Sequence, residues 1–118
     1  MEDRFLQQLK KGGLEMLVLE MVCDAPTYGY ELILRLKEKS NGFFSLKEGT
    51  LYPILYRLED DGMIESKWLQ GEGRSTPKKI YCVTDKGRQS RMERHDTWTA
   101  FVGSVNRFYE EDKNDTGK

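Results

Sequence analysis

The 118-residue sequence has few of the residues from which metal sites and disulfide frameworks are built. It contains one histidine and two cysteines, Cys23 and Cys82, which lie far apart among apolar neighbours. This supply argues against a zinc site with several Cys and His ligands. We interpret both cysteines as small buried hydrophobes of a protein in a reducing compartment, with a redox switch as the alternative. Neither a metal nor another cofactor is expected.

Long apolar runs are also missing from the sequence. No stretch reaches the ~18 apolar residues that a membrane-spanning helix requires, and no signal peptide is visible. The chain likewise has no paired carboxylates, nucleophile with a histidine, or phosphate-binding loop in a suitable structural setting. We therefore expect a soluble, cytoplasmic protein that has no membrane contact and no enzymatic activity.

An overall charge of one sign is absent as well, because 19 basic residues are balanced by 20 acidic ones. The distribution is uneven, however, since residues 67–94 contain eight Lys or Arg and three acidic residues. Such a local basic zone in a nearly neutral chain favours contact with phosphates without indiscriminate binding to polyanions. The alternative is that these residues are ordinary solubilising charges.

Apolar spacing predicts two helices in the first part of the chain. The first helix follows Gly12-Gly13 and ends before Pro26, because apolar residues recur there at helical spacing. The two glycines are expected to separate it from residues 1–12, which form an arm or a short helical turn. The second helix is capped by the Thr27 hydroxyl and fades at a Ser-Asn-Gly turn. Its predicted inward side consists of Tyr30, Ile33, Leu34 and Leu36.

A third helix with one apolar face and a clear end signal comes next. Its start has two alternatives, a capping box formed by Ser45 and Glu48, or a cap at Lys47. Gly62 provides a left-handed C-terminal stop. The apolar stripe has i, i+3, i+4, i+7 spacing and consists of Leu51, Ile54, Leu55 and Leu58.

Two strands and a long helix complete the predicted elements. The strands lie at residues 64–69 and 78–83 and are joined by a connection with the Gly and Pro content of a mobile loop. The last helix begins at Thr84 and runs to about Glu110. This order indicates an α+β fold, mainly α: a winged helix-turn-helix with a two-stranded wing and a long C-terminal dimerisation helix. The predicted parts are an arm (1–12), a DNA-binding domain (13–83), a dimerisation helix (84–110) and a polar tail (111–118).

A winged helix-turn-helix inserts a recognition helix into the DNA major groove and lays its hairpin along the backbone. With the apolar stripe buried, Gly49 permits close approach, Thr50 offers a hydroxyl, and tyrosine hydroxyls reach phosphates. The alternative for the tyrosines is half-buried packing between helices, and for the hairpin cations it is a solvated loop. The predicted DNA contacts are Tyr28, Gly49, Thr50, Tyr52, Pro53, Tyr56, Arg57, Arg74, Lys78 and Lys79.

The predicted C-terminal helix carries a stripe that is too wide and too aromatic for an isolated surface helix. Successive members are spaced 3, 4, 3 and 4 residues apart, and two phenylalanines lie beside them. We expect this stripe to pack against the same helix of a second subunit, with the first helix of that subunit as a further contact. The predicted homodimer residues are Leu14, Val18, Trp98, Phe101, Val102, Val105, Phe108 and Tyr109.

Several motifs in combination make the chain resemble the PadR family of bacterial transcriptional regulators. They span about residues 14–102 and are Pro26-Thr27-Tyr28-Gly29-Tyr30-Glu31, Gly49-Thr50-Leu51-Tyr52-Pro53, Arg57-Leu58-Glu59, Gly62-Met63-Ile64, Trp68, Lys79-Ile80-Tyr81 and Thr84-Asp85-Lys86-Gly87-Arg88. The resemblance implies a homodimeric winged-helix repressor that binds a double-stranded DNA operator with two-fold symmetry. The short C-terminal part is similar to the compact subfamily. Lys47 departs from the family, in which a small capping residue is common, and adds a positive charge to the predicted DNA contacts.

The resemblance also implies a ligand. Effectors of the family are small aromatic or amphipathic molecules, including phenolic acids and drugs, so an aromatic or cationic ligand is expected. In compact relatives an aromatic residue lines a pore between subunits, which assigns effector binding to Trp98, together with His95 and Val102. The alternative for Trp98 is a packed residue of the dimer core. The competing function for the whole chain is a winged-helix protein–protein interaction module that does not bind DNA.

Overall fold

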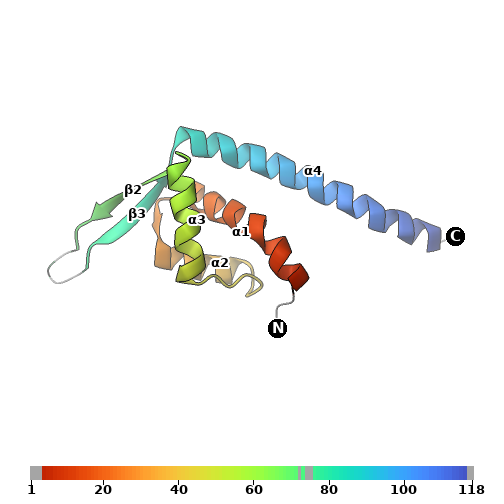
Figure 1. Cartoon of the computed structure of the whole chain (residues 1–118), viewed down its shortest axis with the longest axis horizontal. Coiled ribbons are helices and arrows are strands. Elements are labelled where there is room, and N and C mark those ends of the chain that lie inside the picture. The colour runs from red at the N-terminus through yellow and green to blue at the C-terminus, as the bar shows by residue number, and fades with distance from the viewer. Residues whose placement is uncertain (1–3, 72, 74–75, 117–118) are drawn as a thin grey trace.

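The computed structural model describes residues 4–71, 73 and 76–116, the last six of them by their backbone alone. Three helices form the body of the molecule, a hairpin projects from one end, and the C-terminal helix extends far beyond the body at the other (Figure 1). The longest dimension is 70 Å. The elements are α1 (Arg4–Asp24), β1 (Thr27–Tyr28), α2 (Gly29–Lys39), α3 (Glu48–Asp60), β2 (Ile64–Leu69), β3 (Lys78–Val83) and α4 (Asp85–Thr116).

The fold is a winged helix-turn-helix, as predicted, but its sheet has three strands in the order β1-β3-β2 rather than two. The short strand β1 pairs antiparallel with β3, and Thr27 lies opposite Tyr81. The prediction that Thr27 caps α2 is therefore wrong. Its backbone belongs to the sheet and its hydroxyl donates to the carboxylate of Glu31, while Tyr28 occupies the cap position without a side-chain cap bond.

The hydrophobic core lies between α1, α2, α3 and the root of the hairpin. The apolar stripe predicted for α3 is confirmed, because all four of its members are buried. The inward side predicted for α2 is partly wrong: Tyr30 and Leu34 are exposed, whereas Leu32 and Leu36 are buried. Leu32 and Leu36 are four residues apart and thus share one face of the helix, which packs on the core. Tyr30 and Leu34 lie on a different face.

Helix α1 runs without interruption through Gly12 and Gly13. The prediction that these glycines separate residues 1–12 from the first helix is therefore wrong for residues 4–12. Each glycine costs a helix roughly 1 kcal/mol relative to alanine, which lowers stability but does not forbid helical backbone. As a result, Phe5 and Leu9 lie on the same helix as the core residues of α1, and both are exposed.

The ends of α3 decide between the alternatives that the sequence left open. The helix begins at Glu48, with Lys47 at the cap position and no side-chain cap bond, so the capping box with Ser45 does not form. Gly62 has φ of +76°, which confirms the predicted left-handed stop.

None of the helices in the described part of the chain is long and apolar enough to span a bilayer.

Helix α4 is anchored to the end of α3 through Thr84. The Thr84 hydroxyl accepts the backbone N–H of Gly87 at 3.0 Å and lies 2.6 Å from the carbonyl oxygen of Gly62. This arrangement caps the first turn of α4 and fixes where the helix leaves the body. The helix continues through residues 111–116, six positions beyond its predicted end, so most of the predicted polar tail has a helical backbone.

Gly87 packs so closely against the turn after α3 that a methyl group has no room there. A Cβ at this position would lie 2.0 Å from the backbone oxygen of Met63 and 2.7 Å from a methyl of Val83. We predict that Gly87→Ala lowers the free energy of unfolding by about 3 kcal/mol, because backbone must move. Gly12→Ala, whose Cβ meets no atom within 4 Å, should raise it by about 1 kcal/mol.

Urea denaturation of both variants followed by circular dichroism measures this difference. Equal stability of Gly87→Ala and the wild type would contradict the close packing of α4 on the end of α3.

Candidate nucleic-acid interface

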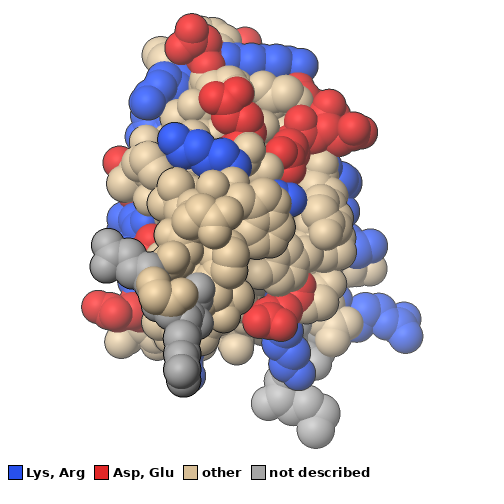
Figure 2. Space-filling view, turned by 90° about the vertical axis from the view of Figure 1, so that its left-hand side faces the viewer, with Lys and Arg blue, Asp and Glu red and all other residues tan. Residues whose placement is uncertain are grey.

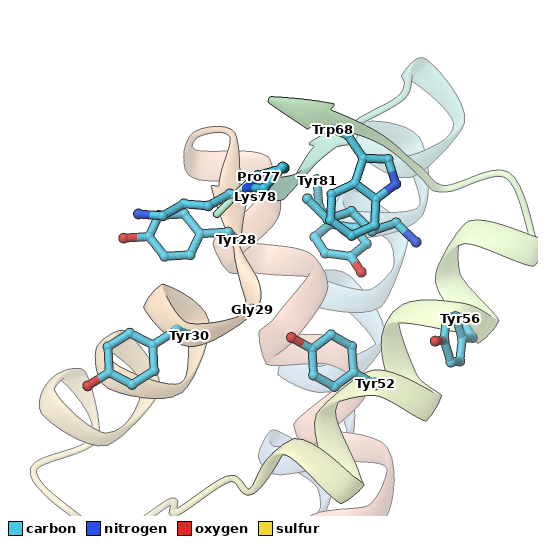
Figure 3. Close-up of a pocket in the computed structure, with 10 residues that line it drawn as sticks. Tyr28, Gly29, Tyr30, Tyr52, Tyr56, Trp68, Pro77, Lys78 and Tyr81 are labelled. Carbon is cyan, nitrogen blue, oxygen red and sulfur yellow. The ribbon is translucent and has the colours of Figure 1, made fainter. Parts of the chain in front are cut away.

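A recess of about 640 Å³ lies between the start of α2, the helix α3 and the hairpin. Figure 3 shows aromatic side chains from all three of these parts around it. No Asp or Glu is among the residues that line it. The lining residues are Tyr28, Gly29, Tyr30, Tyr52, Tyr56, Trp68, Pro77, Lys78, Lys79 and Tyr81.

The strand β3 brings Lys79 and Tyr81 to the same side of the hairpin, because side chains two residues apart share a face. The register places Trp68 of β2 directly opposite Lys79. The Lys79 ammonium lies 5.7 Å from the ring centroid of Tyr81, 5.9 Å from that of Tyr56 and 6.0 Å from that of Trp68. Cation–π attraction to these three rings holds the ammonium of Lys79 at the recess, between the hairpin and α3.

Lys78 is positioned in a similar way at the other side of the recess. Its ammonium lies 4.5 Å from the ring centroid of Tyr28, which precedes the first residue of α2. Two cations therefore lie at opposite walls of one aromatic recess. A phosphate group that approaches the start of α2 would meet a lysine ammonium, a tyrosine hydroxyl and the positive end of a helix dipole.

Tyr52 is half-buried, and it packs partly against the core. Its hydroxyl lies above Gly29, where an added Cβ would be only 2.6 Å away. The structure thus combines both alternatives for this tyrosine, since its ring packs between helices and its hydroxyl reaches the recess. Gly29 is buried, and its lack of a side chain leaves room for that hydroxyl.

Tyr81 lines the recess but is almost fully buried, with 1% of its surface exposed. Its hydroxyl has no hydrogen-bond partner among the described residues. Burial is the main cause that raises the pKa of Tyr81 to about 12, and the neighbouring Tyr52, Glu59 and Tyr56 contribute to this rise. The phenol therefore remains protonated at neutral pH and keeps a proton to donate.

The exposed side of α3 presents Gly49, Thr50, Pro53 and Tyr56, and Lys47 is exposed at its start. Arg57 differs from these residues. Its side chain is also exposed, but its Nε donates to a carboxylate oxygen of Glu15 at 3.0 Å, and Arg94 of α4 reaches the second oxygen at 3.5 Å. Part of the charge of Arg57 is therefore neutralised within the subunit.

The basic zone at residues 67–94 does not form a single positive surface. Arg91 makes two hydrogen bonds of 2.9 Å with Glu20 of α1, and this bond to Arg91 lowers the pKa of Glu20. Together with Arg94, it joins α4 to α1 instead of facing the recess. From the hairpin end, uncharged residues cover the middle of the surface, with basic and acidic side chains around it (Figure 2). Arg74, a predicted DNA contact, lies outside the described residues.

The predicted stripe on α4 is largely exposed in the single subunit. Trp98 and Phe101 stack at 6.2 Å between ring centroids, and both are about half exposed. Val102 is half-buried and His95 is exposed. The remaining stripe members, each exposed, are Val105, Phe108 and Tyr109.

One of the predicted dimer residues on α1 is not available to a partner. Val18 has no exposed surface, because it forms part of the core of its own subunit, so its assignment to an interface is wrong. Leu14 is half-buried and packs against the same core. The exposed apolar residues of α1 are Phe5 and Leu9, which the sequence analysis assigned to an arm.

Sequence reasoning assigned no site role to five of the residues that line the recess: Gly29, Tyr30, Trp68, Pro77 and Tyr81. The signal for one of them was present in the alternation of the strand, since Tyr81 follows Lys79 by two residues. Trp68 could be added only once the register with β3 was known. Within the described residues no group of three or more His, Cys, Asp or Glu is arranged to hold a metal ion.

The winged-helix geometry agrees with the protein family that the sequence matches. The profile of the transcriptional regulator PadR-like family matches residues 18–93, a range that contains α2, α3, the hairpin and the start of α4. The chain belongs to this family. It is therefore a transcriptional regulator of the PadR type, and the α2–α3 and hairpin unit is the winged helix of that family.

Individual relatives agree with the assignment. The negative transcriptional regulator PadR of Bacillus subtilis is 32% identical over 83 residues, which cover 70% of this chain and 43% of that protein. This chain thus spans less than half the length of the Bacillus subtilis regulator. A PadR family regulator from Eggerthella lenta is 33% identical with a TM-score of 0.79, over 90% of this chain and 89% of its own. A PadR-like regulator from Bacillus cereus is 31% identical with a TM-score of 0.73, over 86% of this chain and 95% of its own.

Proposed function

We propose that this PadR-family regulator is a homodimeric repressor that binds a promoter site with two-fold symmetry. In this proposal the exposed side of α3 enters the major groove, and the hairpin lies along the adjacent backbone. The observation that carries it is the convergence of tyrosine hydroxyls and two lysine ammoniums where α2, α3 and the hairpin meet. Phosphate contacts of this kind position a protein on DNA.

The residues that would contact bases are few. Gly49 and Thr50 lie in the first turn of α3, and no Asn or Gln is present in this helix to make a bidentate contact with adenine. Arg57 is the one arginine of α3 and is already paired with Glu15. Sequence-dependent DNA shape and phosphate contacts would therefore provide much of the selectivity.

The exposed stripe on α4 supports a dimer. Large apolar side chains that remain exposed along more than three turns usually mark an interaction surface. Phe5 and Leu9 extend the exposed apolar surface onto α1. A second subunit packed on α4 would link two winged-helix units, the reading heads of the dimer, and so raise their joint affinity for paired half-sites. The same interface would enclose Trp98 with His95 and Val102, the residues to which the family resemblance assigns an aromatic effector.

The second candidate function is a protein–protein interaction module without DNA binding. The observation that favours it is the uncharged middle of the face at the hairpin end, which resembles the core of a protein interface more than a basic DNA surface (Figure 2). The two functions differ in salt dependence, because only DNA binding releases condensed counterions.

The role of Lys79 can be tested with the DNA upstream of the protein's own gene. Lys79→Gln should weaken binding and reduce the slope of log affinity against log salt by roughly 2, because each phosphate contact contributes roughly 0.9 and a dimer loses two. Arg57→Gln should reduce it less, since Glu15 already neutralises that charge. Gel-shift titrations at several salt concentrations measure these slopes.

Lys37→Gln serves as the matched control, because Lys37 is an exposed lysine at the opposite end of α2 from the recess. Its slope should equal that of the wild type. Binding that is indifferent to salt, or an equal slope for Lys79→Gln and the wild type, would contradict the proposed interface.

A further prediction tests the dimer through Val105. Val105→Glu should convert a particle of twice 13.8 kDa into one of 13.8 kDa, because it places a charge within the apolar stripe. Ala100→Glu, on the side of α4 away from the stripe, should leave the dimer intact. Light scattering coupled to gel filtration gives the masses, and a wild-type monomer at micromolar concentration would contradict the dimer.

A further inference from the structure

We propose that the recess between α2, α3 and the hairpin is itself a ligand site, which binds a small planar aromatic anion in competition with DNA. The competition rests on the proposed DNA-binding function, whereas the binding itself does not. The site is distinct from the residues around Trp98, because these lie on α4 and no residue of α4 lines the recess.

The size and walls of the recess suit a flat molecule. Its volume of about 640 Å³ lies within the range of roughly 300–1,000 Å³ that small-molecule sites occupy. Figure 3 shows the rings of Tyr52 and Tyr56 on one side, those of Tyr28 and Tyr30 on another, and Trp68 above Tyr81 on the hairpin. Aromatic walls on several sides favour a planar guest through stacking and edge-to-face contacts.

The charges of the recess select the sign of the guest. Lys78 and Lys79 line it and are held over aromatic rings, and no carboxylate is among its lining residues. The carboxylate of Glu59, on the neighbouring α3, accepts the Ser66 hydroxyl at 2.6 Å and does not line the recess. An anion is thus favoured and a cation is not, in contrast to an aromatic cage for an ammonium group.

The Tyr81 hydroxyl supplies a specific anchor. Buried polar groups in folded proteins almost always have a hydrogen-bond partner, so an unpartnered hydroxyl calls for an explanation. Tyr81 lines the recess, and its oxygen points toward Tyr52 and Tyr56 (Figure 3). Lys79 lies over its ring and forms no ion pair within the described residues. A carboxylate that displaces the Lys79 ammonium slightly would accept from Tyr81 and retain the lysine as its counter-ion.

Occupation of this site would prevent DNA binding directly. The recess is lined by Tyr28, Tyr52, Tyr56, Lys78 and Lys79, all of which belong to the proposed DNA contacts. A guest that neutralises the two lysines and fills the space beside α3 would exclude the phosphate backbone from the same place. Release would then require no change in the spacing of the two reading heads.

The chain offers an internal test, because its two tryptophans lie at the two candidate sites. We would titrate naphthoate by calorimetry and by tryptophan emission into the full-length wild type, Trp98→Phe and Trp68→Phe. The expected result is saturable binding by the first two, with quenching of the remaining Trp68 emission in Trp98→Phe. Naphthamide, which has the same ring system without the charge, should bind at least tenfold more weakly.

Tyr81→Phe separates a ligand role from a structural one. It should weaken naphthoate binding about tenfold, the equivalent of one hydrogen bond to a charged group. Its melting temperature should not fall below that of the wild type, because the substitution removes an unpartnered buried hydroxyl. Unchanged naphthoate affinity in Tyr81→Phe, equal binding of naphthamide, or quenching confined to Trp98 would each overturn the site.

Competition is measured separately with the operator fragment. Naphthoate should displace DNA with an inhibition constant equal to its dissociation constant, in Trp98→Phe as well as in the wild type. Naphthoate binding that leaves DNA affinity unchanged would overturn the competition. A chain that binds naphthoate but no DNA would contradict the proposed repressor function and leave the ligand site standing, so the two failures are distinguishable.

Discussion

The position of β3 between β1 and β2 is the constraint on which the functional surface depends. Because Thr27 pairs with Tyr81 on one side and Trp68 pairs with Lys79 on the other, one strand joins the start of α2 to the wing. The buried ring of Tyr81 lies at this junction. A shift of one residue would turn Lys79 and Tyr81 to the opposite face and leave the recess without its lysine and its hydroxyl.

The same organisation is consistent with the proposed phosphate contacts in a nearly neutral chain. The basic zone of the sequence is divided between two tasks. Arg91 and Arg94 bind glutamates of α1 and orient α4, whereas Lys78 and Lys79 lie over aromatic rings at the recess. In the part of the chain that the structure describes, few cations thus face the proposed DNA site, which is consistent with a regulator that avoids indiscriminate polyanion binding.

Much of this architecture could be predicted from the sequence, because helical periodicity in α3 and alternation in the hairpin are local signals. Three features could not. Strand β1 has two residues and exists only through its distant partner β3, so Thr27 has the appearance of a helix cap. Helix α1 continues through two glycines, because their low helix propensity costs stability without forbidding a helical backbone. The recess joins residues from four segments, and only the register shows that Trp68 shares a face with Lys79 and Tyr81.

The central claim, that the aromatic face at the hairpin end meets DNA, is tested most directly by selective labelling of the six tyrosines. Nuclear magnetic resonance spectra of ring-labelled protein would be followed during titration with the operator fragment. The account predicts salt-dependent shifts for Tyr28, Tyr52 and Tyr56, while Tyr109 on α4 serves as the remote reference. Shifts that are absent from Tyr28, Tyr52 and Tyr56, or confined to Tyr109, would contradict it.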